Sequence, residues 1–548
     1  MISKINSLDL WKIAPVIIFI IFVSPVAIVL FSLTGEYSEN WLHLIEYVLT
    51  GYIINSLVLV IGVSLLTLVI GVGTAWLISN YKFSGKRFFE WALILPLAVP
   101  PYILAYTFTG LFDAYGSANN LIRDIFSFQD AYVFFPSVRN IYGAIIVFSF
   151  TLYPYVYLAS RMAFLNQSKS ILESGKVLGL SKLKVFFNLA LPMVRPAVIG
   201  GLMLVIMETL SDFGAVDHFA IETFTTGIFR TWYGMYDLQT AMQLASLLLI
   251  FITFFILIER FSRKDISYVG NSSVYGEIKF IEVFGINNLL CFGACGIPLF
   301  IGFILPIIEL LNWTYNYKLD FFTGVFLQNS FNTIYLALLA ALICSITALL
   351  INFSIRFKKN KFLSFLSSSL TLGYAVPGLI LAIGVMKLLT FLDANLFSYY
   401  FDLILTGSIA GLIIAYIIKS YALASSVIES GYQRIGSNID DVAITLKITG
   451  LKLLGRVHLP LLKTSFLTSI LLVVSEVIKE LPATLILRPF NFDTLAVSTY
   501  IYASEERMFE AAAPAIAIVL VGLIPIIFLT RMIRESRPGS QNKDTNNA

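Results

Sequence analysis

The chain has 548 residues, of which 58% are hydrophobic and only 13% are charged, and its mean hydropathy is +0.85. Soluble domains carry about 25% charged residues, so most of this apolar surface must lie in lipid rather than in water. The formal net charge of +4 gives no case for a nucleic-acid partner, and the three histidines are scattered without metal-site spacing. Cys291 and Cys295 lie four apart in an apolar run, and a place in the membrane core is favoured over a metal pair because no His or third Cys is near them in sequence.

Long apolar runs follow one another along the whole chain. Because a bilayer-spanning helix needs about 20 apolar residues, the sequence predicts an all-α integral membrane protein with about twelve transmembrane helices. The first run follows Lys4 and Lys12, is too long for a signal-peptide core and is expected to remain as an uncleaved span. The predicted spans lie near residues 12–33, 53–79, 90–112, 141–160, 194–214, 240–258, 283–311, 329–354, 363–391, 402–426, 463–485 and 512–530.

The loops between the predicted spans alternate in charge. The loop at 34–51 has three glutamates and neither Lys nor Arg, whereas basic residues cluster near Lys82, Arg260, Arg356 and Arg531. Cytoplasmic loops carry an excess of Lys and Arg. The sequence therefore predicts a multi-pass protein with both termini in the cytoplasm.

One polar segment occurs twice. Residues 173–192 and 441–460, at an offset of 268 residues, each open on a carboxylate, pass through a polar turn and close on Leu-Pro. Two halves of six spans run in the same direction and are expected to be related by an axis along the membrane normal. The expected division is a first half at 1–265, a cytoplasmic linker at 266–282 and a second half at 283–548.

Each repeated segment is predicted to form helix, turn and helix on the cytoplasmic face. Ser437 precedes Asp440 by three positions, the capping-box spacing that starts a helix. Gly179 permits the turn, and Ser181 can cap the helix that follows. The alternative is an interfacial helix that only links two spans, and the duplication at matching positions argues against it.

The segment resembles the EAA loop of ATP-binding-cassette importer permeases, in which a Glu-Ala-Ala start is followed by Gly and a final Leu-Pro. Lys447 stands where this family has Gly, which leaves open whether the two loops are equivalent. The resemblance implies that each loop, at 165–192 and 433–460, inserts into a groove of an ATPase subunit. The residues expected to couple are Glu173, Ser174, Gly175, Gly179, Leu191 and Pro192 in the first loop, and Asp441, Val442, Ala443, Gly450, Leu459 and Pro460 in the second.

Longer stretches at 208–215, 223–232, 479–484 and 487–496 resemble the ferric iron permeases. This resemblance implies a fused permease subunit in a bacterial plasma (inner) membrane. Such a subunit receives its solute from an extracytoplasmic binding protein, is coupled to two separate cytoplasmic ATPases and binds no cofactor. The chain is expected to be a transport permease and not an enzyme. It has no Gly-x-x-x-x-Gly-Lys-Ser/Thr loop, so ATP hydrolysis is expected in the partner subunits.

Two other functions stay open at this point. Thiamine permeases share the fused design and part of the acidic motif, so an importer of thiamine or another small solute is the near alternative. An ion-coupled secondary transporter with two six-span halves is an alternative of a different class. A secondary transporter needs no cytoplasmic docking element, so the duplicated loops argue against it.

Four carboxylates are candidates for the translocation path. Glu208 and Asp212 lie four apart on one helix face, and Glu476 and Glu480 repeat them at the offset of 268. Ionisable groups at membrane depth usually face a path or a partner, and oxygen ligands suit hard cations such as ferric ion. The structural alternative is an ion pair of Glu476 with Lys479, or helix-end groups at the outer surface.

Two further features accompany them. Pro100-Pro101 and Pro377-Gly378 interrupt predicted spans at equivalent places, which is typical of a binding or gating site, although packing can also absorb such a kink. The Asp217-His218 pair is expected to be a surface feature near the outer face.

Overall fold

A computed structural model describes residues 10–126, 133–165, 179–263, 280–317, 323–358, 360–397 and 404–535, together with residues 167, 175 and 177. The expected all-α membrane fold is confirmed. Within the described residues, nine helices are long and apolar enough to cross a membrane, or up to eleven if each of two bent pairs is one span. The number twelve, the repeat and the domain boundaries stay predictions.

The first half of the chain is built almost wholly from helices. Its elements are α2 (Leu10–Phe31), η1 (Ser32–Thr34), α3 (Asn40–His43), η2 (Leu44–Val48), α4 (Leu49–Asn80), β1 (Tyr81–Lys82), α5 (Lys86–Ala92), η3 (Leu95–Ala98), α6 (Pro101–Phe112), α7 (Ser117–Phe126), α8 (Ile141–Leu165), α10 (Lys182–Val185), η4 (Phe186–Ala190), α11 (Leu191–Ser211), α12 (Gly214–His218), α13 (Phe224–Tyr233) and α14 (Leu238–Arg263).

The second half has a similar succession of elements. They are β2 (Ile281–Glu282), α15 (Ile286–Leu299), η5 (Phe300–Ile304), α16 (Leu305–Asn316), α17 (Gly324–Lys358), α18 (Lys361–Leu370), η6 (Thr371–Ala375), α19 (Gly378–Leu392), η7 (Asp393–Phe397), α21 (Ile409–Gln433), α22 (Ser437–Thr445), α23 (Leu451–Leu453), η8 (Leu454–His458), α24 (Leu459–Leu461), α25 (Lys463–Ile478), α26 (Pro482–Leu487), α27 (Leu495–Ser504) and α28 (Ala512–Glu535).

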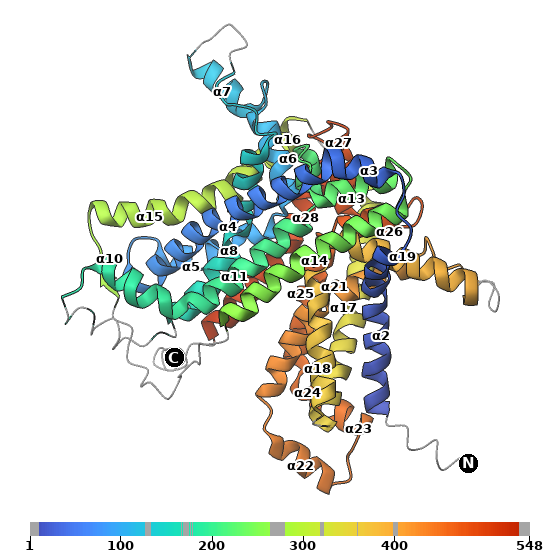
Figure 1. Cartoon of the computed structure of the whole chain (residues 1–548). Coiled ribbons are helices and arrows are strands. Elements are labelled where there is room, and N and C mark those ends of the chain that lie inside the picture. The colour runs from blue at the N-terminus through green and yellow to red at the C-terminus, as the bar shows by residue number, and fades with distance from the viewer. Residues whose placement is uncertain are drawn as a thin grey trace, which may run out of the picture.

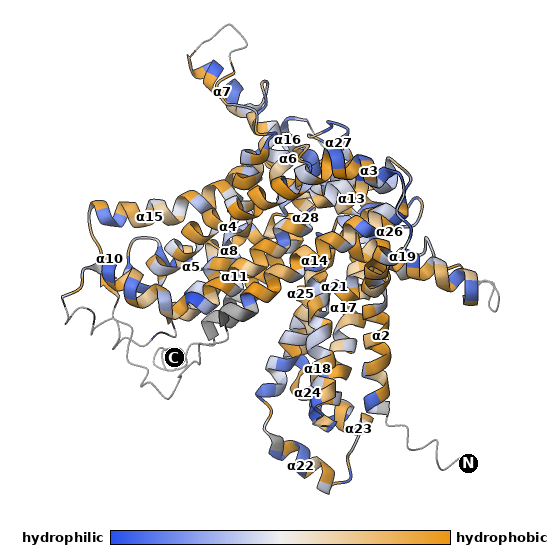
Figure 2. Cartoon of the chain, in the orientation of Figure 1, coloured by the Kyte–Doolittle hydropathy of each residue, from blue (hydrophilic) through white to orange (hydrophobic). Residues whose placement is uncertain are grey.

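The outward faces of the long helices are apolar. On α4, the exposed side chains of Val58, Ile61, Leu65 and Val69 recur every three or four residues. Such a stripe would be unstable in water, and it suits a helix whose backbone groups are all satisfied internally and whose face meets lipid. Figure 2 shows hydrophobic residues along most of both bundles, with hydrophilic residues gathered toward α7 and α22.

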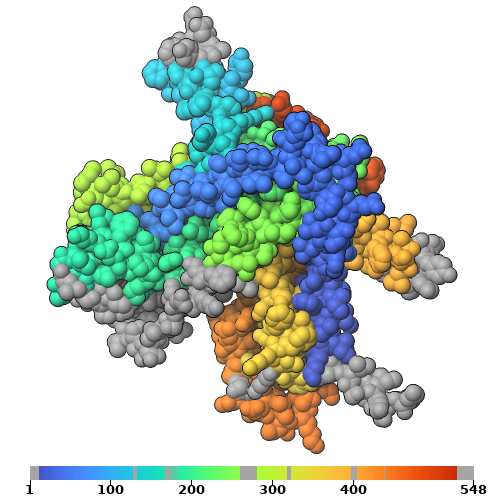
Figure 3. Space-filling model, viewed as in Figure 1, coloured from blue at the N-terminus to red at the C-terminus, as the bar shows by residue number. Residues whose placement is uncertain are grey.

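The first long helix of each half packs against the other half. α2 contacts α17, α18 and α19, while α15 and η5 contact α4, α5 and α8. Aromatic pairs mark both contacts: the rings of Trp11 and Phe353 lie 4.6 Å apart, and those of Phe89 and Phe292 lie 5.1 Å apart. Figures 1 and 3 show α2 running beside the second bundle and α15 beside the first.

A short parallel ladder joins the expected linker to the first half. Residues 266–279 of that linker lie outside the described residues, but β2 at its end pairs with β1 in the register Tyr81 to Ile281 and Lys82 to Glu282. The Lys82 ammonium also contacts the Glu282 carboxylate at 2.6 Å. The beginning of the second half is thereby attached to the cytoplasmic end predicted for α4.

Both proline positions interrupt helices. η3 ends at Ala98, Val99 is extended and α6 begins at Pro101, so the two parts of this span meet at 90°. In the second half η6 ends at Ala375 and α19 begins at Gly378. Proline lacks a backbone donor and forces the preceding residue out of the helical region, which explains each break. Both breaks lie where the two halves meet.

Candidate translocation cavity and coupling segments

A cavity of about 80 Å³ lies where the break before α6 meets the C-terminal ends of α11 and α25. Its wall includes all four predicted carboxylates, and two lysines join them. The ionisable residues of the wall are Glu208, Asp212, Lys419, Glu476, Lys479 and Glu480. Residues from both halves therefore form one polar chamber, and transport through it remains a prediction.

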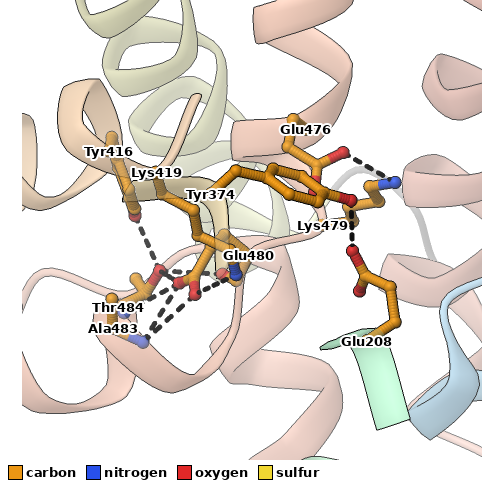
Figure 4. Close-up of polar contacts among 9 residues, drawn as sticks. All are labelled: Glu208, Tyr374, Tyr416, Lys419, Glu476, Lys479, Glu480, Ala483 and Thr484. Carbon is orange, nitrogen blue, oxygen red and sulfur yellow. Dashed lines mark hydrogen bonds and ion pairs between the residues drawn. The ribbon is translucent and has the colours of Figure 1, made fainter. Parts of the chain in front are cut away.

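Glu480 is the most extensively bonded of these acids (Figure 4). Its carboxylate accepts hydrogen bonds from the backbone amides of Ala483, at 3.1 Å, and Thr484, at 3.2 Å, in the first turn of α26. Lys419 on α21 forms an ion pair with it at 3.1 Å. A carboxylate at a helix N-terminus is favoured by the helix dipole, and the ammonium balances its charge in a buried setting.

Asp212 has the equivalent position in the first half. Its Oδ1 accepts hydrogen bonds from the backbone amides of Ala215, at 2.8 Å, and Val216, at 3.3 Å, in the first turn of α12. Asp212 and Glu480 are thus helix-end groups, as the structural alternative allowed, and both also face the cavity. Among the described residues Asp212 has no ion-pair partner.

The other two acids make different contacts. Tyr374 in η6 donates a hydrogen bond of 2.5 Å to Glu208, which connects the second half to the first (Figure 4). Glu476 forms an ion pair of 2.9 Å with Lys479 three residues later, so that predicted pair exists. Four carboxylates and two ammonium groups leave two acids in excess, which gives the chamber a negative charge when all are ionised.

Sequence reasoning missed Lys419 and Tyr374. Lys419 lies inside the apolar run predicted at 402–426, and a charge at membrane depth is itself a signal of a functional or paired site. Tyr374 carried no such signal, because tyrosine is common in apolar helices. Neither residue belongs to the carboxylate pattern that repeats at the offset of 268.

The first coupling segment is described in part. Glu173 and Ser174 lie outside the described residues. Gly175 is buried, and a Cβ built on it would lie 2.7 Å from Leu189 Cδ1. Gly179 takes a left-handed conformation with φ of +73°, and the Leu180 amide donates to the Gly175 carbonyl at 3.0 Å. Leu191 and Pro192 are the first two residues of α11.

The second segment forms the same turn with different residues. Ala443 is buried, and the Ile448 amide donates to its carbonyl at 2.9 Å. Lys447 adopts a φ of +58° where the first segment has glycine, and Gly450 follows with φ of +57°. Both turns show the six-to-one bond of the Schellman motif. The backbone geometry of the turn is therefore kept although Lys447 replaces glycine.

The two segments differ after the turn. Gly450, rather than Thr449, directly precedes the next helix, whereas Ser181 Oγ accepts a bond from the Lys184 amide at 3.4 Å. Leu459 and Pro460 lie in α24, which ends at Leu461, and the chain then bends by 80° into α25. α11, by contrast, continues without interruption from its own Leu-Pro to Ser211.

α22 lies at the far end of the second bundle (Figure 1), and apolar side chains in it and directly after it are exposed. Val442 is 59% exposed and Leu446 67% exposed, while Asp441 is also exposed. A short helix with exposed apolar residues is typical of an element that docks into a groove of a partner. The coupling role of Asp441 and Val442 remains a prediction.

Asp440 anchors α22 instead of capping it. The helix begins at Ser437 and not after it, so the expected capping box is wrong. The Asp440 carboxylate instead contacts Arg356 on α17 at 2.7 Å and His458 at 2.8 Å. Partial burial opposes ionisation of this carboxyl, but the hydrogen bonds from Arg356 and His458 hold its pKa below the usual range. The Arg356 guanidinium also donates to the backbone carbonyls of Tyr432 and Ile435.

Asp217 and His218 are not the surface pair that the sequence suggested. Both are half-buried where the halves meet. Asp217 accepts a hydrogen bond of 2.8 Å from Tyr500 of the second half, and His218 bonds to Thr109 on α6 at 2.9 Å.

The chain is similar in sequence to known transport proteins. Residues 67–264 match the family of binding-protein-dependent transport system inner membrane components. The chain is 25% identical over 487 residues to an Fe(3+)-transport system permease protein of Haemophilus influenzae, an alignment that covers 87% of this chain and 89% of that protein. It is 24% identical to a ferric transport system permease protein of Actinobacillus pleuropneumoniae, with 90% of this chain and 73% of that protein covered.

A shorter match involves a molybdenum transport system permease protein of Escherichia coli. The identity is 28% over 151 residues, which covers 28% of this chain and 63% of that protein. Three ferric transport permeases align with 76% to 90% of the chain, and they confirm the resemblance drawn from the sequence.

Proposed function

We propose, from the premise that this chain is a permease of the binding-protein-dependent transport type, that it is the membrane-spanning subunit of an ATP-driven importer of ferric iron. The chain is a transport protein rather than an enzyme. The observation that carries the proposal is the similarity to Fe(3+) permeases over most of the chain. The carboxylate-lined chamber and the turn that occurs in both coupling segments are consistent with it.

Two ATPase subunits would dock at the repeated segments. The matched turns at Gly179 and Lys447 support two docking sites, one for each half. The exposed apolar residues of α22 suit a groove on a partner, and Asp440 fixes the angle at which the helix is presented. In this proposal both segments and both termini are cytoplasmic, as the charge of the loops predicts.

A binding protein would deliver the ion at the opposite face, near residues 216–238 and 487–510, which include α13 and α27. The ion would then pass through the chamber between the halves. Two carboxylates in excess over lysines favour a cation there, and oxygen atoms are the ligands that hard cations prefer. Movement of the ATPases would be transmitted by the coupling segments and would open the chamber to alternate sides.

The test is transport by the reconstituted complex. The chain, its ATPase subunits and its binding protein are placed in liposomes, and iron import and ATP hydrolysis are followed together. We expect ferric-loaded binding protein to stimulate hydrolysis and import, and thiamine to do neither. Import driven by an ion gradient without ATPase subunits, or hydrolysis stimulated by thiamine instead of iron, would overturn the proposal.

A further inference from the structure

One face of α6 connects the chamber to a second cavity. Tyr102, Tyr106 and Thr109 are spaced four and three residues apart, so they lie along the same side of the helix. Tyr102 lines the chamber, and Thr109 lines a second cavity of about 630 Å³ beside α7 and α16. Tyr106 lies between these two positions. This face of α6 therefore runs from the wall of the chamber to the wall of the second cavity.

Two phenolic oxygens on this face lack partners. The side chains of Tyr102 and Tyr106 are each only 3% exposed, and neither hydroxyl has a hydrogen-bond partner among the described residues. Buried hydroxyls are nearly always bonded, because leaving one unsatisfied is unfavourable. Their ring centroids are 5.8 Å apart. Two hydroxyl oxygens one helical turn apart are therefore free to bind a ligand.

The neighbours of the two rings include a glycine, a histidine and a carboxylate of the chamber wall. Gly214 lies against Tyr102, since a Cβ built on it would come within 2.9 Å of Tyr102 Cβ. Gly214 follows Asp212 by two residues, and Asp212 shares the chamber wall with Tyr102. The His218 ring lies 4.7 Å from the Tyr106 ring and is held by its bond to Thr109. Asp212 thus supplies a carboxylate to the same chamber wall as the first phenol.

We propose that Tyr102 and Tyr106 ligate the ferric ion in transit between the second cavity and the chamber, with Asp212 as the carboxylate at the inner end. The inference rests on the proposed function. Ferric ion is a hard cation that binds phenolate and carboxylate oxygens. Each iron–oxygen bond forms as the phenol loses its proton to water in the cavity; the iron stays ferric and no electron is transferred.

The modest number of ligands suits transit rather than storage. Within the described part of the chain, no group of three or more His, Cys, Asp and Glu side chains is placed to hold a metal ion. A conducting site must bind its ion well enough to admit it and weakly enough to release it. Two phenols and one carboxylate meet that requirement. Glu480 and Glu476 are less available, because each already pairs with a lysine.

The test compares matched tyrosine variants of the full chain assembled with its ATPases. Tyr102→Phe and Tyr106→Phe each remove one unpartnered oxygen and keep the ring. The control is Tyr153→Phe, because Tyr153 is also fully buried with an unpartnered hydroxyl but lies on α8 rather than on this face of α6. We expect each α6 variant to lower iron import about tenfold, as loss of a metal-site contact does, and the control to leave it unchanged.

Spectroscopy gives a second readout. Ferric citrate added to the complex in nanodiscs should produce the visible charge-transfer band of an iron–phenolate bond. The band should persist in Tyr153→Phe and vanish in the double variant Tyr102→Phe with Tyr106→Phe. Normal import by both single variants, or an undiminished band in the double variant, would overturn the inference while leaving ferric import intact. A wild-type complex that moves no iron would overturn the proposed function as well.

Discussion

Asp212 and Glu480 make the same contact in the two halves of the chain. Each carboxylate accepts hydrogen bonds from the backbone amides three and four residues ahead, and so holds the first turn of α12 or α26 at the cavity wall. The two carboxylates differ in their ion pairs. Lys419 lies against Glu480, whereas Asp212 has no ion-pair partner in the described part of the chain.

This difference predicts unequal losses of stability. Glu480→Gln leaves Lys419 charged without its partner, which should cost about 3 kcal/mol. Asp212→Asn keeps an oxygen for the amides and loses a charge at a helix N-terminus, which should cost about 1 kcal/mol. The thermal unfolding midpoint in detergent measures both. Replacing Lys419 with Met in the Glu480→Gln variant should restore most of the loss, and equal midpoints for the two single variants would contradict the explanation.

Tyr374 is predicted to hold the chamber closed. Its hydrogen bond to Glu208 crosses between the halves, and a bond to an ionised group contributes about 1.5–3 kcal/mol. Tyr374→Phe should therefore favour the open state and raise the labelling of Ser211→Cys, a chamber position, about tenfold. The three native cysteines are first replaced by alanine. Labelling that is no faster than in the parent protein would show that the bond does not control access.

The left-handed turns predict opposite effects of substitution. Gly179→Pro cannot adopt a φ of +73°, so it should break the first turn and weaken ATPase binding and uptake. Lys447→Gly removes the strain of a side chain at φ +58° and should stabilise the second turn by about 1 kcal/mol without loss of uptake. Co-purification of the ATPase reports both. Weaker binding in the Lys447→Gly variant would mean that the lysine side chain itself contacts the partner.

The sequence predicted features that depend on local pattern. The offset of 268 brought together the four carboxylates, and the prolines marked the breaks before α6 and α19. Lys419 and Tyr374 could not be found in this way, because neither residue belongs to the repeated carboxylate pattern. The packing of α2 against the second half and of α15 against the first half was not predicted. It depends on contacts between segments far apart in the sequence, such as Trp11 with Phe353, and no local periodicity encodes them. The 80° bend before α25 likewise has no counterpart in the repeat.

Asp440 supplies the last prediction, because it ties the second coupling helix to the bundle. Asp440→Asn weakens the contacts with Arg356 and His458, and the loss of charge-assisted bonds should cost about 1.5–3 kcal/mol. α22 should then move independently of α17, so that ATP is hydrolysed with less iron imported for each ATP. The ratio of import to hydrolysis measures this, with Glu429→Gln, an exposed carboxylate near the end of α21, as the control.

The pKa of the Asp440 carboxyl group decides at which pH the assay should be run. Its folded pKa is lowered, so its stabilising contribution is complete above the unfolded value of about 3.9 and is lost only as the pH falls through the lower folded value. Measurements near neutral pH therefore report the whole effect of Asp440→Asn. If the variant and the control keep the same ratio of import to hydrolysis, the Arg356–Asp440–His458 contact positions α22 without transmitting movement, and coupling must pass through the turn at Lys447.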